Sequence, residues 1–309
     1  MTVTASIAIR SAHRAALWCL LAVLFTTHAG ANSVSDVHAG RGWRVRVYAD
    51  NLPKIDNIVS RRDGSVYATQ ALGDSGGKVV RLRAGQVELV VGNLECPRGL
   101  LVKKQHLYVT EKTNGGRVLE INLTDNTRRR IENVFNPEHI EKLPGGDLIV
   151  TENGVNGRLV RITNKNLVEV VTAGLNDPEG LAVGQDGTIY IGENGIGRVL
   201  AFKDGALDVV IDDLDELGQI EAGADGTLWI TEKGAPGRLL HLKDGTLETV
   251  LTGLKDPRGV ALMDNGAVLV SESGRARILL AEPKSAIEPK LPPETKPIVE
   301  SKPAVESKP

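Results

Sequence analysis

Charged side chains suited to binding or catalysis stand at five of six equivalent positions in six similar segments of the chain, and the fifth segment has glycine instead: Asp56, Arg98, Glu138, Glu179, Gly218 and Arg258. Three are carboxylates, and carboxylates that face one another repel unless a cation separates them. Sites rich in oxygen ligands bind Ca²⁺ or Mg²⁺. Asp56, Glu138 and Glu179 are therefore candidate ligands of a divalent cation, with Ca²⁺ the first choice. The alternative, a structural ring of salt bridges, remains open.

The basic members of this set extend the hypothesis. Arg98 and Arg258 either pair with the acids or bind a small polar or anionic molecule through their guanidinium groups. His139 directly follows Glu138. It is a candidate general base or metal ligand, and a hydrogen-bonded structural histidine is the alternative.

A second acidic set is more regular: Glu111, Glu152, Glu193, Glu232 and Glu272. Each is followed five or six residues later by an arginine, and the first unit of the chain has Gln70 and Lys78 instead. A Glu–Arg pair that braces a loop in each unit explains both facts. We interpret this set as structural.

These positions belong to a repeat, which decides the fold. Gln70 and the five glutamates are 41, 41, 41, 39 and 40 residues apart. Each follows a short run of β-forming residues, such as Leu107-Tyr108-Val109-Thr110. Most of these runs follow an Asp-Gly or similar turn of the kind that hairpins need, such as Asp186-Gly187. The pattern predicts six units of four strands, in which the last unit lacks its own fourth strand.

Residues 43–52 resemble the end of the first unit and supply the missing strand. The sequence therefore predicts an all-β, six-bladed β-propeller whose last blade is closed by the N-terminal strand, an arrangement that protects the sheet edges. The order of the strands places the six mouth positions and the regular glutamates on one face, here called the top. The Asp-Gly turns lie on the opposite face. Because first strands line the central channel, the six positions are expected at its mouth.

The ends of the chain differ in composition from the repeats. Residues 1–31 read as a secretory signal peptide, with Arg10 and Arg14 before the apolar run 15–25 and a small-residue cleavage pattern at 29–31. We expect a linker at 32–42, the propeller at 43–281 and a Pro/Lys/Glu-rich tail without fixed structure at 282–309. These features predict a periplasmic or secreted protein without a transmembrane segment in the mature chain.

Two compositional features exclude further classes. A net charge of -2 and 3% aromatic residues give no basis for nucleic-acid binding. Once the signal peptide is removed, Cys96 is the remaining cysteine, so no intramolecular disulfide is expected.

The segment Pro178-Glu179-Gly180-Leu181-Ala182-Val183, with Asp186-Gly187 and Arg198-Val199, resembles an NHL-type repeat. The six-blade count makes residues 43–281 similar to the senescence-marker-protein/gluconolactonase superfamily. Trp229-Ile230-Thr231-Glu232 also resembles the virginiamycin B lyase type of propeller. The first resemblance implies a divalent cation at the channel mouth. Glu179 stands in place of an Asp ligand of that family. Glu138-His139 lies near the family's Asn-Gly ligand, and Asp56-Asn57 lies near its first-blade Glu. At all three positions the residue type differs from the family's.

Two functions follow as expectations. The first is a cation-dependent hydrolase for a lactone or sugar-acid ester, the substrate class that the resemblance implies. There the cation would polarise the carbonyl, Asp56 or Glu138 would activate water, and Arg98 or Arg258 would stabilise the oxyanion. The alternative is a non-catalytic scaffold, expected to be a monomer, that binds a ligand or a protein partner through its top face or tail. Whether the protein is an enzyme stays open at this point.

Overall fold

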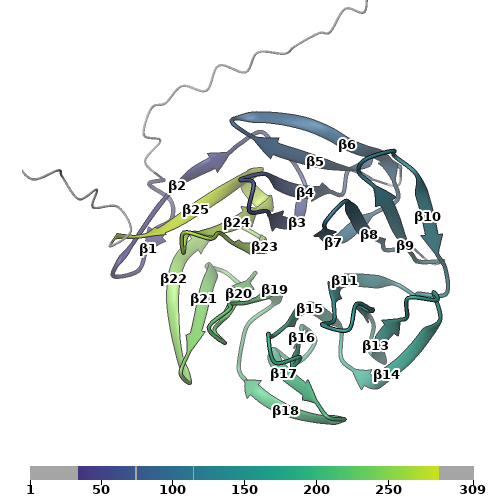
Figure 1. Cartoon of the computed structure of the whole chain (residues 1–309). Helices are drawn as coiled ribbons and strands as arrows, with labels where there is room; N and C mark the ends of the chain where they lie inside the picture. Colours follow the sequence, from purple (N-terminus) through teal and green to yellow (C-terminus); the bar gives the residue numbers. More distant parts are fainter. Residues whose placement is uncertain (1–33, 74, 114, 285–309) are drawn as a thin grey trace, which may run out of the picture. The chain divides into compact units, whose positions relative to one another are not determined.

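The structure is a computed structural model that describes residues 34–73, 75–113 and 115–284. Most of these residues lie in the strands of a repeated four-stranded sheet. Six sheets surround a central channel (Figure 1). This confirms the predicted all-β, six-bladed propeller. No helix within the described ranges is long and apolar enough to cross a membrane.

The first three blades share one plan, in which each strand pairs with the next along the chain. They are β3 (Ile55–Ser60), β4 (Val66–Gln70), β5 (Gly77–Arg83) and β6 (Gln86–Leu94); β7 (Pro97–Lys103), β8 (His106–Glu111), β9 (Arg117–Asn122) and β10 (Arg128–Ile131); and β11 (Pro137–Lys142), β12 (Leu148–Glu152), β13 (Gly157–Ile162) and β14 (Val168–Leu175).

Blade 4 has the same plan as the first three blades. Blades 5 and 6 differ, because the outermost strand of each comes from the N-terminal segment. The strands of these three blades are β15 (Pro178–Val183), β16 (Ile189–Glu193), β17 (Arg198–Lys203) and β18 (Ala206–Ile211); β19 (Leu217–Ala222), β20 (Leu228–Glu232), β21 (Gly237–Lys243), β22 (Thr246–Leu254) and β1 (His38–Ala39); and β23 (Pro257–Leu262), β24 (Val268–Glu272), β25 (Arg277–Pro283) and β2 (Trp43–Ala49), with a 3₁₀ turn at Ser273–Arg275.

The ring closes as predicted, because β2 pairs antiparallel with β25 from Trp43↔Pro283 to Ala49↔Ile278. The alternation of β2 turns Trp43, Val45 and Val47 toward the apolar cluster around Trp229. The Trp43 and Trp229 rings meet edge to face with their centroids 5.5 Å apart. Closure is therefore both a hydrogen-bonded pairing and a packed interface.

The segment expected to be a linker, 32–42, contains structure from residue 36 onward. β1 pairs with the outer edge of β22, Val37 is buried, and Asp36 forms ion pairs with Arg275 and Arg277. The physical reason is that the edge of β22 offers free backbone donors and acceptors. The last blade also extends two residues past 281, since β25 ends at Pro283. The expected signal peptide and most of the expected tail lie outside the described residues.

The predicted Glu–Arg braces are present in blades 2 to 6. Each glutamate is buried at the end of the second strand and forms an ion pair with an arginine of the third strand. Its other carboxylate oxygen accepts the backbone N–H of a residue 16 or 17 positions earlier, in the loop that leads into the blade. In blade 1, Gln70 donates its Nε2 to the carbonyl of Pro53 instead. The regular acidic set is therefore structural.

Candidate functional site at the channel mouth

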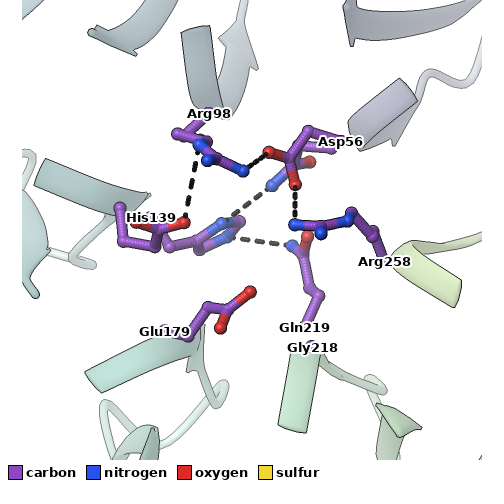
Figure 2. Close-up of a pocket in the computed structure, with 10 residues that line it drawn as sticks. Asp56, Arg98, His139, Glu179, Gly218, Gln219 and Arg258 are labelled. Carbon is purple, nitrogen blue, oxygen red and sulfur yellow. Dashed lines mark hydrogen bonds and ion pairs between the residues drawn. The ribbon is translucent and has the colours of Figure 1, made fainter. Parts of the chain in front are cut away.

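All six residues of the predicted mouth set line one small pocket, together with Asn57, Gly99, His139 and Gln219 (Figure 2). They come from the first strands of all six blades, as the strand order predicted. The pocket has a volume of about 20 Å³, room for about one water-sized group. A ligand larger than this group must therefore lie mostly above the pocket.

In five blades a threonine or serine stands directly before the brace residue, Gln70 in blade 1 and a glutamate in the others, and it positions the mouth. Thr110 donates its Oγ1 hydrogen to the carbonyl of Glu138 in the next blade, at 2.9 Å. The same bond joins Thr69 to Arg98 and Ser271 to Asp56. Blade 4 has Gly192 at this position, and it precedes the blade whose mouth residue is Gly218. The Thr-Glu repeat thus aligns the mouth backbones as well as supplying the braces.

Glycines let the first strands approach closely around the channel. A Cβ on Gly99 would lie 2.7 Å from the carbonyl oxygen of Glu138 and 2.8 Å from the Cα of His139. A Cβ on Gly259 would lie 2.8 Å from the backbone nitrogen of Ile58. Larger residues at these two positions would push neighbouring blades apart.

Every carboxylate of the pocket has a basic partner. An oxygen of Asp56 lies 2.5 Å from Nη1 of Arg98, and its other oxygen lies 3.9 Å from Nη1 of Arg258. Glu138 contacts Nζ of Lys112 at 2.6 Å and Nε of Arg98 at 3.8 Å. The two are therefore linked through Arg98 into one network.

Glu179 forms a separate pair on the other side of the mouth. Its two oxygens accept hydrogen bonds from Nζ of Lys233 at 2.8 and 2.7 Å. Lys112 and Lys233 were missed by the sequence analysis. The sequence contained a signal for both lysines, because each directly follows a brace glutamate, and the residue at that position points toward the mouth.

These contacts fit a divalent cation poorly. Four basic side chains surround the three carboxylates expected to be ligands, and a cation would have to displace Lys112 and Lys233 to gain oxygen ligands. Within the described ranges, no group of three or more His, Cys, Asp or Glu residues is arranged to hold a metal. The arrangement instead matches the alternative of a salt-bridge ring. Asp256, which pairs with Arg258 at 3.1 Å, brings this ring to four basic and four acidic groups.

His139 is buried and has both ring nitrogens engaged. Nδ1 lies 2.8 Å from the Asn57 amide of blade 1, and Nε2 lies 2.9 Å from the Gln219 amide of blade 5. A neutral imidazole has one donor and one acceptor, so in that state one of the two amides presents its oxygen. His139 therefore ties three blades together across the channel, which favours the structural alternative over a general base.

Burial and charge shift the ionisation of the mouth residues. Burial raises the pKa of Glu179 to about 7, with Glu138 and Asp56 adding to the rise and Lys233 opposing it. Burial disfavours the charge of Arg98, but Asp56 and Glu138 outweigh this effect and raise the pKa of its guanidinium. The arginines thus stay charged, while Glu179 changes charge near neutral pH.

A second buried acid lies on β19, three residues after the mouth position. Burial raises the pKa of Glu221 to about 8, Glu141 on β11 adds to the rise, and Lys103 on β7 opposes it. Glu141 also lies 3.9 Å from Nε2 of His139. The first strands therefore carry a second set of charged groups beyond His139.

We expect Glu221→Gln to stabilise the protein at high pH. Below about pH 4.5 the carboxyl is protonated in both states, so wild type and variant should match. As pH rises toward 8 the unfolded chain ionises more readily than the folded one, and wild type loses stability. The gain above pH 8 should be on the order of 2 kcal/mol, allowing for the partial exposure of Glu221.

Urea unfolding at pH 4, 6 and 9 measures this difference. Glu169→Gln, at an exposed carboxylate, is the matched control and should change little at any pH. A variant less stable than wild type at pH 9 would show that ionised Glu221 is stabilised in the folded state.

The comparisons with known proteins identify the fold. No protein-family model matches the chain, and no curated protein sequence matches it. Among solved structures, virginiamycin B lyase from Staphylococcus aureus is similar with a TM-score of 0.58 and 20% identity, over 74% of this chain and 80% of that one. A gluconolactonase from Xanthomonas campestris matches with a TM-score of 0.63 and 14% identity, over 77% and 89%.

A third neighbour is regucalcin from Agrobacterium tumefaciens, described as a calcium-binding protein. It has a TM-score of 0.62 and 13% identity, over 77% of this chain and 93% of that one. At these identities the likeness concerns the fold. The chain is a six-bladed β-propeller with the architecture shared by the senescence-marker-protein/gluconolactonase and virginiamycin B lyase propellers.

Proposed function

We propose that the protein is a binding propeller whose channel mouth takes the carboxylate, or a similar anionic group, of a small molecule without a metal ion. The observation that carries this proposal is the ion pairing of the mouth. Four basic groups face the three carboxylates of the pocket and Asp256, which pairs with Arg258 at 3.1 Å, so protonation of Glu179 leaves a net positive charge for an added anion. This arrangement favours the scaffold hypothesis over the cation-dependent hydrolase.

Two unpartnered polar atoms support a ligand in the pocket. Oδ1 of Asn57 and Nε of Arg98 are buried and have no hydrogen-bond partner among the described residues. Buried polar groups are normally satisfied, so such atoms in a pocket call for a water or a ligand group. The free guanidinium N–H of Arg98 is suited to a carboxylate oxygen.

The expected signal peptide supports a periplasmic or extracellular site of action. The neighbours named as gluconolactonase and regucalcin support testing sugar acids and calcium first. Sugar acids combine a carboxylate, one oxygen of which would enter the small pocket, with hydroxyls that would lie on the polar top face.

Calorimetric titration with gluconate, in the presence of a chelator, tests the proposal. We expect Arg98→Gln and Arg258→Gln each to weaken binding by about tenfold or more, since each removes a charged hydrogen-bond donor. Arg81→Gln, in an exposed pair with Glu88 on the outer rim, is the control and should bind like wild type. Binding that requires Ca²⁺, or turnover of gluconolactone that requires it, would favour the hydrolase instead.

Ligand binding should strengthen as the pH falls. Protonation of Glu179, whose pKa is about 7, removes a negative charge from the mouth, whereas a carboxylate ligand stays ionised down to about pH 5. We expect affinity for gluconate to rise by about tenfold between pH 8.5 and 5.5. Glu179→Gln should bind equally well across this range. An affinity for wild type that falls with pH would contradict this account.

A further inference from the structure

A groove on the outer rim between blades 1 and 2 is separate from the channel. It has a volume of about 380 Å³, within the range of small-molecule sites. Figure 1 shows its two outer strands, β6 and β10, next to each other on the rim. The residues that line it are Asn93, Leu94, Glu111, Arg117, Leu119, Arg128 and Arg130.

Comparison among the blades shows that two of these residues are exceptions to the repeat. In blade 2, Arg128 and Arg130 pair with Ile121 and Leu119 on the third strand. The equivalent pairs of positions in the other blades that carry their own outer strand are Val87 and Leu89, Val168 and Val170, Leu207 and Val209, and Leu247 and Thr249. The fold therefore uses uncharged, mostly aliphatic residues here, and architecture does not require the two arginines.

The arginines also lack acidic partners. Within the described ranges, neither Arg128 nor Arg130 forms an ion pair, and both are exposed. Arg129, which points to the other face of β10, pairs with Glu120 at 2.7 Å from Nε. Arg117 contacts both Glu111 and Glu95, and Glu132 also acts on its charge. The lining therefore holds three guanidiniums and one carboxylate, and Arg128 and Arg130 are the two guanidiniums left for a ligand.

The floor of the groove adds an apolar surface, since Leu94 and Leu119 are buried beneath it. Two residues apart on one strand, Arg128 and Arg130 have Cα atoms about 6.6 Å apart. Guanidinium groups bind carboxylates and phosphates through paired hydrogen bonds. We propose that the groove binds a small molecule with two acidic groups, carboxylate or phosphate, joined by a short apolar or neutral spacer.

Calorimetric titration of adipate and of inorganic pyrophosphate into the Arg98→Gln variant tests this proposal, because that background weakens binding at the channel mouth. The test variant adds Arg128→Val and Arg130→Val, the residues that blade 3 carries at these positions. We expect one bound ligand per chain and a loss of affinity of at least tenfold in the double substitution. Tighter binding of adipate would identify carboxylates, and tighter binding of pyrophosphate would identify phosphates.

Arg129→Gln is the matched control, since it removes one positive charge from the same strand on the opposite face. It should change affinity by less than about threefold, because exposed charges outside the site are screened by salt. Equal binding by the Arg98→Gln background with and without the two valine substitutions, equal losses in the Arg129 control, or no binding of either probe at millimolar concentration would overturn the proposal. A failure of gluconate binding at the channel mouth would leave these results unaffected.

Discussion

A chain that begins at residue 50 is expected to lose the cooperative unfolding of the propeller. It lacks β1 and β2, so β25 becomes an open edge and the cluster around Trp229 loses Trp43, Val45 and Val47. Full burial of such a side chain contributes about 1.5 to 3 kcal/mol. Val37 is buried and the other three are partly buried, so with the lost pairing of β2 the sum approaches the whole stability of a typical domain. Urea unfolding followed by circular dichroism measures the loss, and the method does not depend on the missing tryptophan.

A chain that begins at residue 42 distinguishes the contribution of β2, which closes the ring, from that of β1, which adds a strand to blade 5. It keeps β2 and removes β1, which forms a two-residue pairing with β22. We expect this shorter deletion to cost about 1 to 3 kcal/mol, chiefly from the buried Val37. If the chain beginning at residue 50 had the same unfolding midpoint as the one beginning at 42, β2 would not be the element that closes the ring.

Glu152→Ala is expected to cost about 3 kcal/mol of unfolding free energy. Glu152 is 2% exposed and pairs with Arg158, and it also accepts the backbone N–H of Phe135 at 2.7 Å. Alanine removes both interactions and leaves the N–H of Phe135 without its acceptor. Arg158 is partly exposed and can regain water, which keeps the loss below the upper end for buried pairs.

Glu152→Gln is the informative comparison. Blade 1 carries Gln70 at the equivalent position, so the fold accommodates this side chain. Its amide oxygen can still accept from Phe135, and we expect a cost of about 1 kcal/mol. Equal losses in the alanine and glutamine variants would show that the charge of the brace matters more than its hydrogen bond to the loop. If both variants lost less than about 0.5 kcal/mol of unfolding free energy, the brace would not contribute appreciably to stability.

The two acidic sets were separable from the sequence because they differ in regularity. The brace set repeats with its arginine at a fixed spacing, and its pairing is local within one blade. The mouth set varies between acid, base and glycine, and its pairing depends on neighbours from other blades. Sequence therefore predicted that Asp56, Glu138 and Glu179 meet. It left open whether they face a cation or basic side chains.

The groove between blades 1 and 2 is a second site whose charge arrangement could not be predicted from the sequence. The run Arg128-Arg129-Arg130 is visible in the sequence, but a charge run alone most often indicates a solvated surface. The register of β10 on β9 turns Arg128 and Arg130 toward blade 1, and Arg129 toward Glu120. This side assignment needed the strand pairing, since a shift of one residue would exchange the faces.

The sequence by itself determined the number of blades, the closing strand and the face that carries the mouth. These follow from a repeat of about forty residues, because alternation, turn residues and a fixed spacing are local properties of the chain. The tertiary structure alone decided how the mouth charges are satisfied. Lys112 reaches Glu138 in the next blade and Lys233 reaches Glu179 in the preceding one. Such contacts arise between residues far apart in the chain, and they turned a candidate cation site into a ring of ion pairs.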